Sequence, residues 1–215
     1  RPMKADAVLL AMGNRPNTEF LADSGLEMFK GTLLVDGDMR TNDPDIYAVG
    51  DCALVTNRVT GQRQWSAMGS TANITGRLAA TRIAGETGPY PGVLGTGVAK
   101  LPGVSMGRTG LTEAAAKKAG FNVETIVVAA DDKAHYYPGS EKMMMKLICD
   151  RDTHKLLGMQ ALGNGAVDKM TDIAVTAISM GAALEELQSC DFAYAPPFST
   201  AIHPFAVAVN ALLNK

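Results

Sequence analysis

The stretch that decides the fold is "TNDPDIYAVGDCALV", Thr41–Val55. A polar, turn-forming run meets the short apolar run "IYAV", which predicts a strand, and Gly50 and Asp51 follow it at once. Ligands of open α/β sheets bind beyond the carboxyl ends of strands. A carboxylate accepts hydrogen bonds from hydroxyl or N–H groups, and a glycine lets a ligand approach the backbone closely. The stretch therefore predicts a ligand-binding turn, with an ordinary turn and a solvated acid as the alternative.

The composition is that of a soluble globular protein. The chain has 215 residues, of which 47% are apolar and 20% charged, and its formal net charge is −2. This charge gives no electrostatic attraction to nucleic acid or to an anionic membrane, and no apolar run approaches the roughly 20 residues of a membrane span. Three histidines without ligand spacing predict no metal site. The cysteines Cys52, Cys149 and Cys190 are odd in number and widely spaced, which favours free thiols in a reducing cytoplasm.

The first part of the chain has the pattern of an α/β unit. The apolar run Ala5–Gly13 predicts a buried strand, and a short helix follows it, with Asn17 or Thr18 as its N-cap and Gly25 as its end. The segments "TLLVD" and "IYAVGD" predict two further strands. Small residues crowd the beginning of the helix predicted over Ser66–Gly85.

A segment rich in glycine and proline, Glu86–Gly97, predicts a linker with a domain boundary near residue 95. Beyond it, the sequence predicts one or two short strands, a helix that Thr112 caps, and a strand at "NVETIVVAA". A hairpin turns at "RDTH", and two helices follow, at "AVDKMTDIAVTAISMG" and "ALEELQSC". The first of these helices places Val167, Met170, Ala174, Ala177 and Ile178 on one face, and the chain ends in another helical run.

Five of these segments resemble one enzyme family in the order in which the family has them. "ADAVLLAMGNRPN" and "TNDPDIYAVGDCA" resemble the central signatures of the FAD-dependent pyridine nucleotide-disulfide oxidoreductases. "GRTGLTEAAAKKAGF", "HYYPGSEKMMMKLICD" and "YAPPFS" resemble their C-terminal dimerisation domain. The branch that the chain resembles most contains the coenzyme A-disulfide reductases and the NADH oxidases and peroxidases.

The resemblance implies a fold and a division into domains. The expected fold class is α/β, with the C-terminal part of an FAD/NAD(P)-binding fold at 1–95 and an α+β dimerisation domain at 96–215. The family's G-x-G-x-x-G motif and its N-terminal redox cysteine do not occur in this sequence. The chain therefore resembles about the C-terminal half of such an enzyme.

The resemblance also implies residues that bind FAD. Asp51 would bond the ribityl chain beside Gly50, and the helix that starts at Ala67 and Met68 would direct N–H groups to the pyrimidine side of the flavin. Gly13 would approach the bound cofactor. The alternatives are plain turns at the glycines and tight helix packing at Ala67 and Met68. Cys52 is expected to be a structural thiol, because the family's reactive cysteine lies elsewhere.

Aromatic residues of the C-terminal part are implied in the substrate site. Tyr137 and Tyr194, and with less support Tyr136, match segments that lie near the disulfide substrate of the partner subunit in the coenzyme A-disulfide reductase branch. Phe198 would pack near the partner's flavin; ordinary packing is the alternative for all four. His203 resembles the His-Pro base of glutathione reductases, but no acid follows to orient it, so packing or an interface position is the alternative.

These residues lead to one expected function with two alternatives. The first is a homodimeric cytoplasmic flavoprotein that moves electrons from NAD(P)H through FAD to a small disulfide, of coenzyme A type. An NADH oxidase or peroxidase, with oxygen or peroxide as acceptor, is the alternative within the family. The alternative from another class is a dimerisation module that is inert by itself. Neither nucleic acid nor a membrane is expected as a partner.

Overall fold

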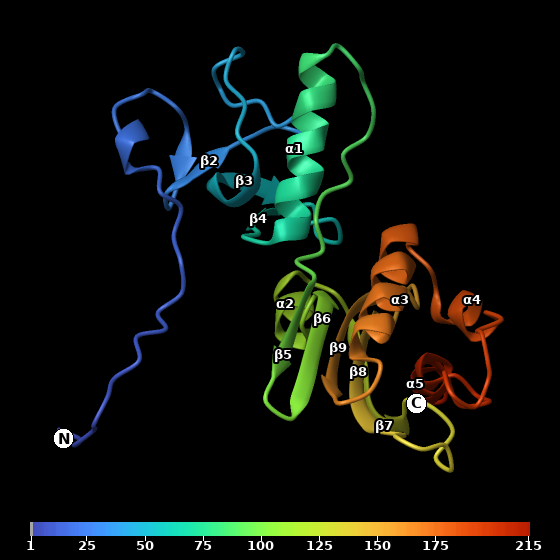
Figure 1. The fold of residues 1–215 in the computed structure, drawn as a ribbon. Helices are drawn as coiled ribbons and strands as arrows, with labels where there is room; N and C mark the ends of the chain where they lie inside the picture. Colours follow the sequence, from blue (N-terminus) through green and yellow to red (C-terminus); the bar gives the residue numbers. More distant parts are fainter. Residues whose placement is uncertain (1) are drawn as a thin grey trace.

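The computed structural model describes residues 2–215, which form two units, one above the other in Figure 1. The upper unit has a small sheet of four short strands and the helix α1 (Gly69–Ile83). The lower unit has a five-stranded antiparallel sheet with helices along one side. Both units combine strands and helices, which confirms the α/β class that the sequence predicted. The position of the domain boundary near residue 95 stays a prediction.

The sheet of the upper unit follows the order of the sequence, β1-β2-β3-β4. Its strands are β1 (Met28–Phe29), β2 (Thr32–Leu34), β3 (Ala53–Thr56) and β4 (Arg63–Trp65). The β2–β3 pair is parallel, while β1–β2 and β3–β4 are antiparallel. A buried cluster that includes Leu33, Val35 and Val55 packs against Ala79 of α1. The helix thus covers a sheet whose strands are two to four residues long.

Two strand predictions for this unit were wrong. Ala5–Gly13 forms no strand: the segment is extended and exposed, with Leu9 at 92%. A strand needs a partner for its backbone hydrogen bonds, and none of the described residues pairs with this segment. The run Ile46–Asp51 contains one isolated bridge, Arg40↔Tyr47, and then a 3-10 turn at Gly50–Cys52, labelled η2. The strand β3 begins only after that turn.

The helix predictions for this unit agree with the structure better than the strand predictions do. Helix α1 lies within the predicted range Ser66–Gly85, and Gly85 follows its end at φ +87°. The short helix predicted after Asn17 is a 3-10 turn, η1 (Glu19–Leu21). Thr18 precedes it without capping it, because its hydroxyl donates to the carbonyl oxygen of Gly31 at 2.5 Å.

The sheet of the lower unit has the order β5-β6-β9-β8-β7. Its strands are long: β5 (Gly97–Leu101), β6 (Val104–Gly110), β7 (Val123–Asp131), β8 (Lys142–Asp150) and β9 (Leu156–Gly163). The hairpin predicted around "RDTH" is the β8–β9 pair. Strand and hairpin predictions for this unit are therefore confirmed.

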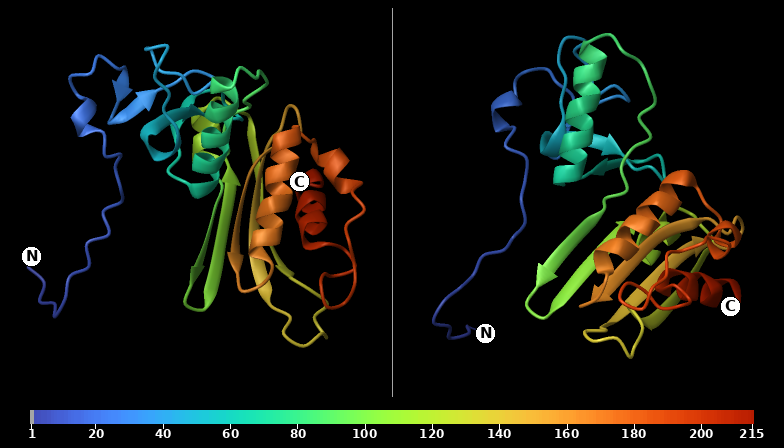
Figure 2. Two further views of the ribbon diagram at one scale, coloured as in Figure 1. Left: turned by 45° about the horizontal axis from the view of Figure 1, so that its top comes forward. Right: turned by 45° about the vertical axis from the view of Figure 1, so that its right-hand side comes forward.

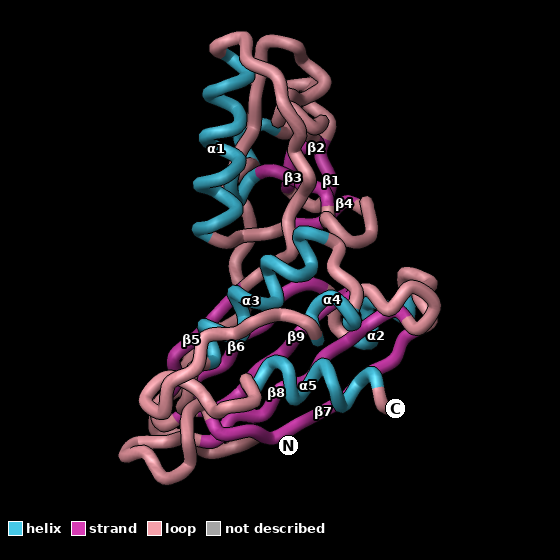
Figure 3. Tube along the Cα trace, turned by 90° about the vertical axis from the view of Figure 1, so that its right-hand side faces the viewer, coloured by secondary structure: helices cyan, strands magenta, loops and turns pink. Residues whose placement is uncertain are grey.

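Three of the four helices described in the lower unit gather on one face of this sheet. Figures 2 and 3 show α3 (Val167–Met180) and α5 (Pro204–Leu213) along that face, with α4 (Leu184–Gln188) beside them. The predicted apolar face of α3 is buried: Val167, Met170, Ala174, Ala177 and Ile178 are all 6% exposed or less. Thr112 caps α2 (Glu113–Lys118), as predicted, by accepting a hydrogen bond from the N–H of Ala115 at 3.2 Å.

No helix in the part of the chain that the structure describes is both long enough and apolar enough to cross a membrane.

Candidate functional site

The Gly50 turn is built around the approach of α1. Gly50 is buried at φ +68°, its N–H donates to Oγ1 of Thr75 at 3.1 Å, and a Cβ at this position would lie 3.3 Å from Cβ of Ala72. A left-handed backbone and a close helix together account for the glycine. The sequence predicted a glycine that lets a ligand approach the backbone; the structure shows a close approach of α1, and the role of Gly50 in binding a cofactor stays a prediction.

Asp51 directs a carboxylate outward from this turn. Its side chain is exposed, and its backbone carbonyl accepts a hydrogen bond from Nε1 of Trp65 on β4 at 2.7 Å. Asp51 precedes β3 and so does not stand at the carboxyl end of a strand. This corrects the geometry expected from the sequence, although the acid is accessible as predicted.

The beginning of α1 offers hydrogen-bond donors next to the turn. Met68 is the N-cap residue and supplies no side-chain cap, so the first N–H groups of the helix lack a partner within it. Gly69 and Ser70 are exposed. The N–H of Met68 itself donates to the carbonyl oxygen of Ser66 at 3.0 Å. The N–H of Met68 is therefore engaged, while the N–H groups after it in the first turn of α1 are open; Ala67 and Met68 are both half-buried.

Gly13 lies apart from the Gly50 turn and the beginning of α1. It stands at φ +81° on the exposed N-terminal segment, and a Cβ there would have no other residue's atom within 4 Å beyond its chain neighbours. The segment runs away from both sheets (Figure 1). The structure thus does not bring Gly13 to the Gly50 turn.

A second group of predicted residues gathers on the lower unit. The N–H of Ala134, in the loop between β7 and β8, donates to the carbonyl oxygen of Pro196 at 3.3 Å. This contact joins the loop that carries Tyr136 and Tyr137 to the segment that carries Tyr194. The hydrogen bond of Tyr136 with the side chain of Tyr194 raises the pKa of Tyr136.

The aromatic side chains of this group are open to solvent. Tyr136, Tyr137, Tyr194 and Phe198 are between 38% and 71% exposed. Lys169 on α3 holds the same segment by donating to the carbonyl oxygen of Phe198 at 3.3 Å. Four exposed aromatic rings on two linked loops make a surface that can contact a ligand or another protein chain. The sequence had not singled out Lys169, since a lysine in the first turn of a helix carries no distinctive pattern.

His203 is buried and already engaged. Its Nδ1 accepts a hydrogen bond from the N–H of Phe205 at 3.2 Å and thereby caps α5. Its ring stacks on that of Phe192, with 4.4 Å between the ring centroids. Burial, and then the charge of Lys169, lower the pKa of His203 to about 4. The imidazole is therefore neutral at pH 7 and stabilises the helix, which fits the packing alternative better than the general base.

All three cysteines are free thiols; Cys52 and Cys149 fit a structural role, whereas Cys190 is exposed. The thiol of Cys52 donates to the carbonyl oxygen of Val49 at 3.2 Å. Cys149 is buried in the core, and burial raises its pKa to about 11, far from an activated thiolate.

The two groups lie on different units and do not meet within one chain. The Gly50 turn belongs to the upper unit and the tyrosine loops to the far end of the lower unit (Figures 1 and 2). The upper group offers a carboxylate and uncapped N–H groups, which suit hydroxyls and an electron-rich oxygen. The lower group offers phenols.

Comparison with family models identifies the class of protein. Residues 1–81 match the pyridine nucleotide-disulphide oxidoreductase model, and residues 100–206 match the dimerisation domain of the same family. The chain belongs to the pyridine nucleotide-disulphide oxidoreductase family, which confirms the resemblance found in the sequence.

The individual relatives to which the chain is similar are named for two different activities. It is 36% identical over 210 residues to the NAD(P)H sulfur oxidoreductase (CoA-dependent) of Pyrococcus furiosus, covering 97% of this chain and 47% of the relative. It is 34% identical over 210 residues to an NADH oxidase of Methanocaldococcus jannaschii, covering 98% and 47%. The chain thus spans about half the length of the curated relatives it matches.

A solved structure agrees with these relatives. A NAD-dependent persulfide reductase from A. fulgidus superposes with a TM-score of 0.92 at 37% identity, covering 98% of this chain and 39% of that one. The arrangement of the two units is therefore shared with a solved member of the family.

Proposed function

We propose that the whole protein is a flavoprotein that moves electrons from NAD(P)H through FAD to a small disulfide or persulfide of coenzyme A type. The observation that carries this proposal is the separation of two incomplete groups, the Asp51 carboxylate with the start of α1 and the tyrosine loops. In the proposed two-fold dimer, the upper group of one chain meets the lower group of its partner, and by symmetry this contact occurs twice. A cytoplasmic location and a homodimer are part of the proposal.

The residues of the upper unit would hold the cofactor. The Asp51 carboxylate is exposed and can accept hydrogen bonds from the hydroxyls of the ribityl chain. The open first turn of α1 after Ala67 and Met68 suits an oxygen that gains negative charge. When bound, FAD supplies the electron-transfer chemistry that no side chain of this chain provides. Gly13 remains a cofactor-binding residue only in this proposal.

The residues of the lower unit would act on the substrate of the partner subunit. A phenol at Tyr194 or Tyr137 can donate its proton to a thiolate that leaves during disulfide cleavage, and a thiolate of lower basicity leaves faster. Phe198, 71% exposed, would pack beside the partner's flavin. The side chain of Tyr136, whose pKa the neighbouring Tyr194 raises, would help to orient the Tyr194 hydroxyl. His203 would support this segment by packing.

A second function has a specific observation behind it. The identity to the NADH oxidase of Methanocaldococcus jannaschii, 34%, is almost as high as the 36% identity to the sulfur oxidoreductase, each over 210 residues. An NADH oxidase of the same family, with oxygen as acceptor, is therefore the alternative. The isolated 215-residue chain would serve as a dimerisation module.

The first experiment separates the two half-reactions of the whole protein in an anaerobic stopped-flow instrument. NAD(P)H should reduce the flavin, and coenzyme A disulfide should reoxidise it faster than air does. Tyr194→Phe should slow the second step and leave the first unchanged, with Tyr90→Phe as a control far from the loops. Reoxidation by oxygen alone would establish the oxidase instead.

The second experiment titrates FAD into the apoprotein. Asp51→Ala removes a hydrogen bond to a charged group, which contributes roughly 1.5–3 kcal/mol, so FAD affinity should fall about tenfold or more. An unchanged affinity would contradict the role of Asp51. Light scattering of the 215-residue chain tests the dimer, and a monomer at micromolar concentration would exclude it for this chain.

A further inference from the structure

One face of the five-stranded sheet is largely open, while α3 and α5 cover the other. Along β8 the exposure alternates: Met143 and Met145 are 1% and 0% exposed under the helices, whereas Met144 between them is 52% exposed. On β6, a Cβ at Gly107 would lie 2.2 Å from Oγ1 of Thr171 on α3, so the helix contacts that face closely. Within the described residues, the other face is covered only at one end, where Ala116 of α2 packs with Leu157 and the fully buried Ile148.

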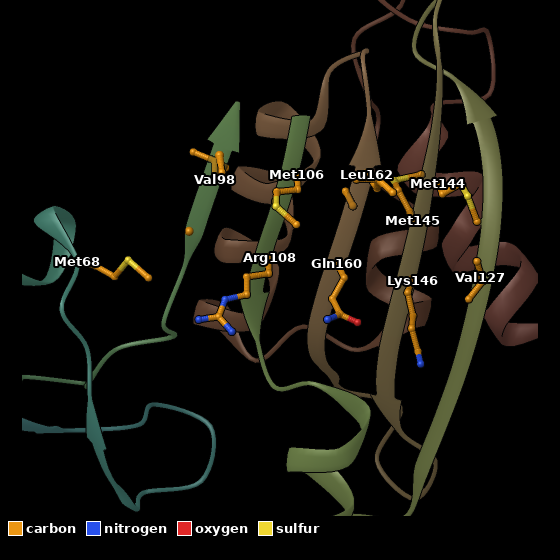
Figure 4. A pocket seen from close by; sticks show the side chains of 14 residues that line it. Met68, Val98, Met106, Arg108, Val127, Met144, Met145, Lys146, Gln160 and Leu162 are labelled. Carbon is orange, nitrogen blue, oxygen red and sulfur yellow. The ribbon is translucent and has the colours of Figure 1, made fainter. Parts of the chain in front are cut away.

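The open face carries two ordered rows of side chains. Met106 pairs with Leu162 and Leu162 with Met144, so an apolar row crosses β6, β9 and β8. Two residues along each strand, Arg108, Gln160 and Lys146 form a polar row in the same register. Figure 4 shows both rows, which point to the same side of the sheet.

The polar row leaves one cation for a partner. Lys146 already pairs with Glu113 at 2.5 Å, whereas Arg108 is exposed and has no ion pair with any described residue. Arg108 can therefore receive a carboxylate, and Gln160 between the two cations can donate or accept hydrogen bonds. A segment that fits this face needs an apolar side against the methionines and an acidic or amide group against Arg108.

The rows border a hollow that also touches the upper unit. The hollow measures ≈ 640 Å³, and Met68 at the beginning of α1 lines it together with Val98 and the two rows. Figure 4 shows Met68 at one end. Whatever fills the hollow contacts both units at once.

We propose that in the whole protein an amphipathic segment of the flavin-binding half covers this open face. The curated relatives are about twice as long as this chain, which covers 47% of them, so a comparable length of polypeptide is available in the relatives to cover such a face. The segment places apolar side chains on Met106, Leu162 and Met144 and an acidic side chain on Arg108. It thereby joins the lower unit to the cofactor site at Met68.

Methionine oxidation tests the cover without any substitution. The 215-residue chain and the whole protein are treated with dilute hydrogen peroxide, and the oxidised positions are located by mass spectrometry of peptides. In the 215-residue chain, Met144 and Met106 should oxidise at least tenfold faster than the buried Met143 and Met145. In the whole protein, Met144 and Met106 should become as slow as Met145. Equal rates for Met144 in the two proteins would overturn the proposal.

Two further measurements identify the occupant. If a second copy covers the face, protection of Met144 will appear in the 215-residue chain and rise with protein concentration, which contradicts the proposal. Met144→Lys should lower the Tm of the whole protein by several degrees and leave that of the 215-residue chain unchanged, because only the whole protein buries the charge. Met144→Leu is the matched control and should change neither. These outcomes need no enzymatic activity, so they are independent of the proposed function.

Discussion

The two units differ in how far each one builds its own core. The buried cluster of the lower unit, centred on Met145, Met159 and Phe205, contains more than twice as many side chains as that of the upper unit around Leu33 and Val55. Strands of the lower sheet run five to nine residues, and those of the upper sheet two to four. A unit with long strands and a large core is stabilised by its own contacts. The upper unit, with the exposed run Ala5–Gly13, depends more on its few close contacts.

The largest expected effect comes from the core of the lower unit. Phe205 is fully buried and meets Phe192 edge-on at 6.2 Å, so Phe205→Ala should lower the free energy of unfolding by about 3–5 kcal/mol. Phe29→Ala is the control in the upper unit: Phe29 is 53% exposed, and its loss should cost less than about 0.5 kcal/mol. Urea unfolding measures both. Equal costs would remove the contrast between the units.

The second prediction concerns the pH dependence of the lower unit. The pKa of His203 is lowered from 6.5 to about 4, so between these values the unfolded chain binds the proton and the folded chain does not. Stability should therefore be lost as pH falls from about 6.5 to about 4, on the order of 2–3 kcal/mol. His203→Asn keeps an acceptor for the N–H of Phe205 and should flatten this part of the profile. A profile unchanged by the substitution would contradict the assignment.

The third prediction examines the contact between the Gly50 turn and α1 in the upper unit. Gly50→Ala forces an alanine to φ +68° and 3.3 Å from Cβ of Ala72, which should cost about 1–2 kcal/mol. Gly61 has the same φ but nothing within 4 Å of a Cβ. Gly61→Ala therefore measures the cost of the left-handed backbone conformation alone. The difference between the stability losses of the two variants, measured by thermal unfolding, is the cost of the contact with α1. Identical shifts would show that α1 does not constrain the turn.

The smallest effect should be a gain in stability. Gly76 lies inside α1 with an ordinary φ, and a Cβ there would have nothing within 4 Å. Gly76→Ala should stabilise the upper unit of this chain by roughly 0.5–1 kcal/mol, because glycine loses more conformational freedom on folding. Thermal unfolding measures the gain. A destabilised variant would reveal a neighbour that presses on this face of the helix.

The sequence by itself determined the lower unit well. The spacing of apolar residues on α3, the cap at Thr112 and the turn at "RDTH" are local signals, and the partners they need lie within the same chain. The family could also be recognised from the sequence, because its signature segments occur in the order in which the family has them. The site residues Asp51, Tyr137 and Tyr194 followed from those signatures, and their roles stay predictions.

Only the tertiary structure decided what surrounds each residue. An apolar run such as Ala5–Gly13 becomes a strand only when another strand accepts its hydrogen bonds, and the run does not specify that partner. Likewise, Gly50 makes room for α1, His203 is occupied in capping α5, and Met144 faces outward between two buried methionines. Local patterns act between neighbours in the chain, whereas burial depends on contacts between distant residues, and those contacts form only when the chain has folded.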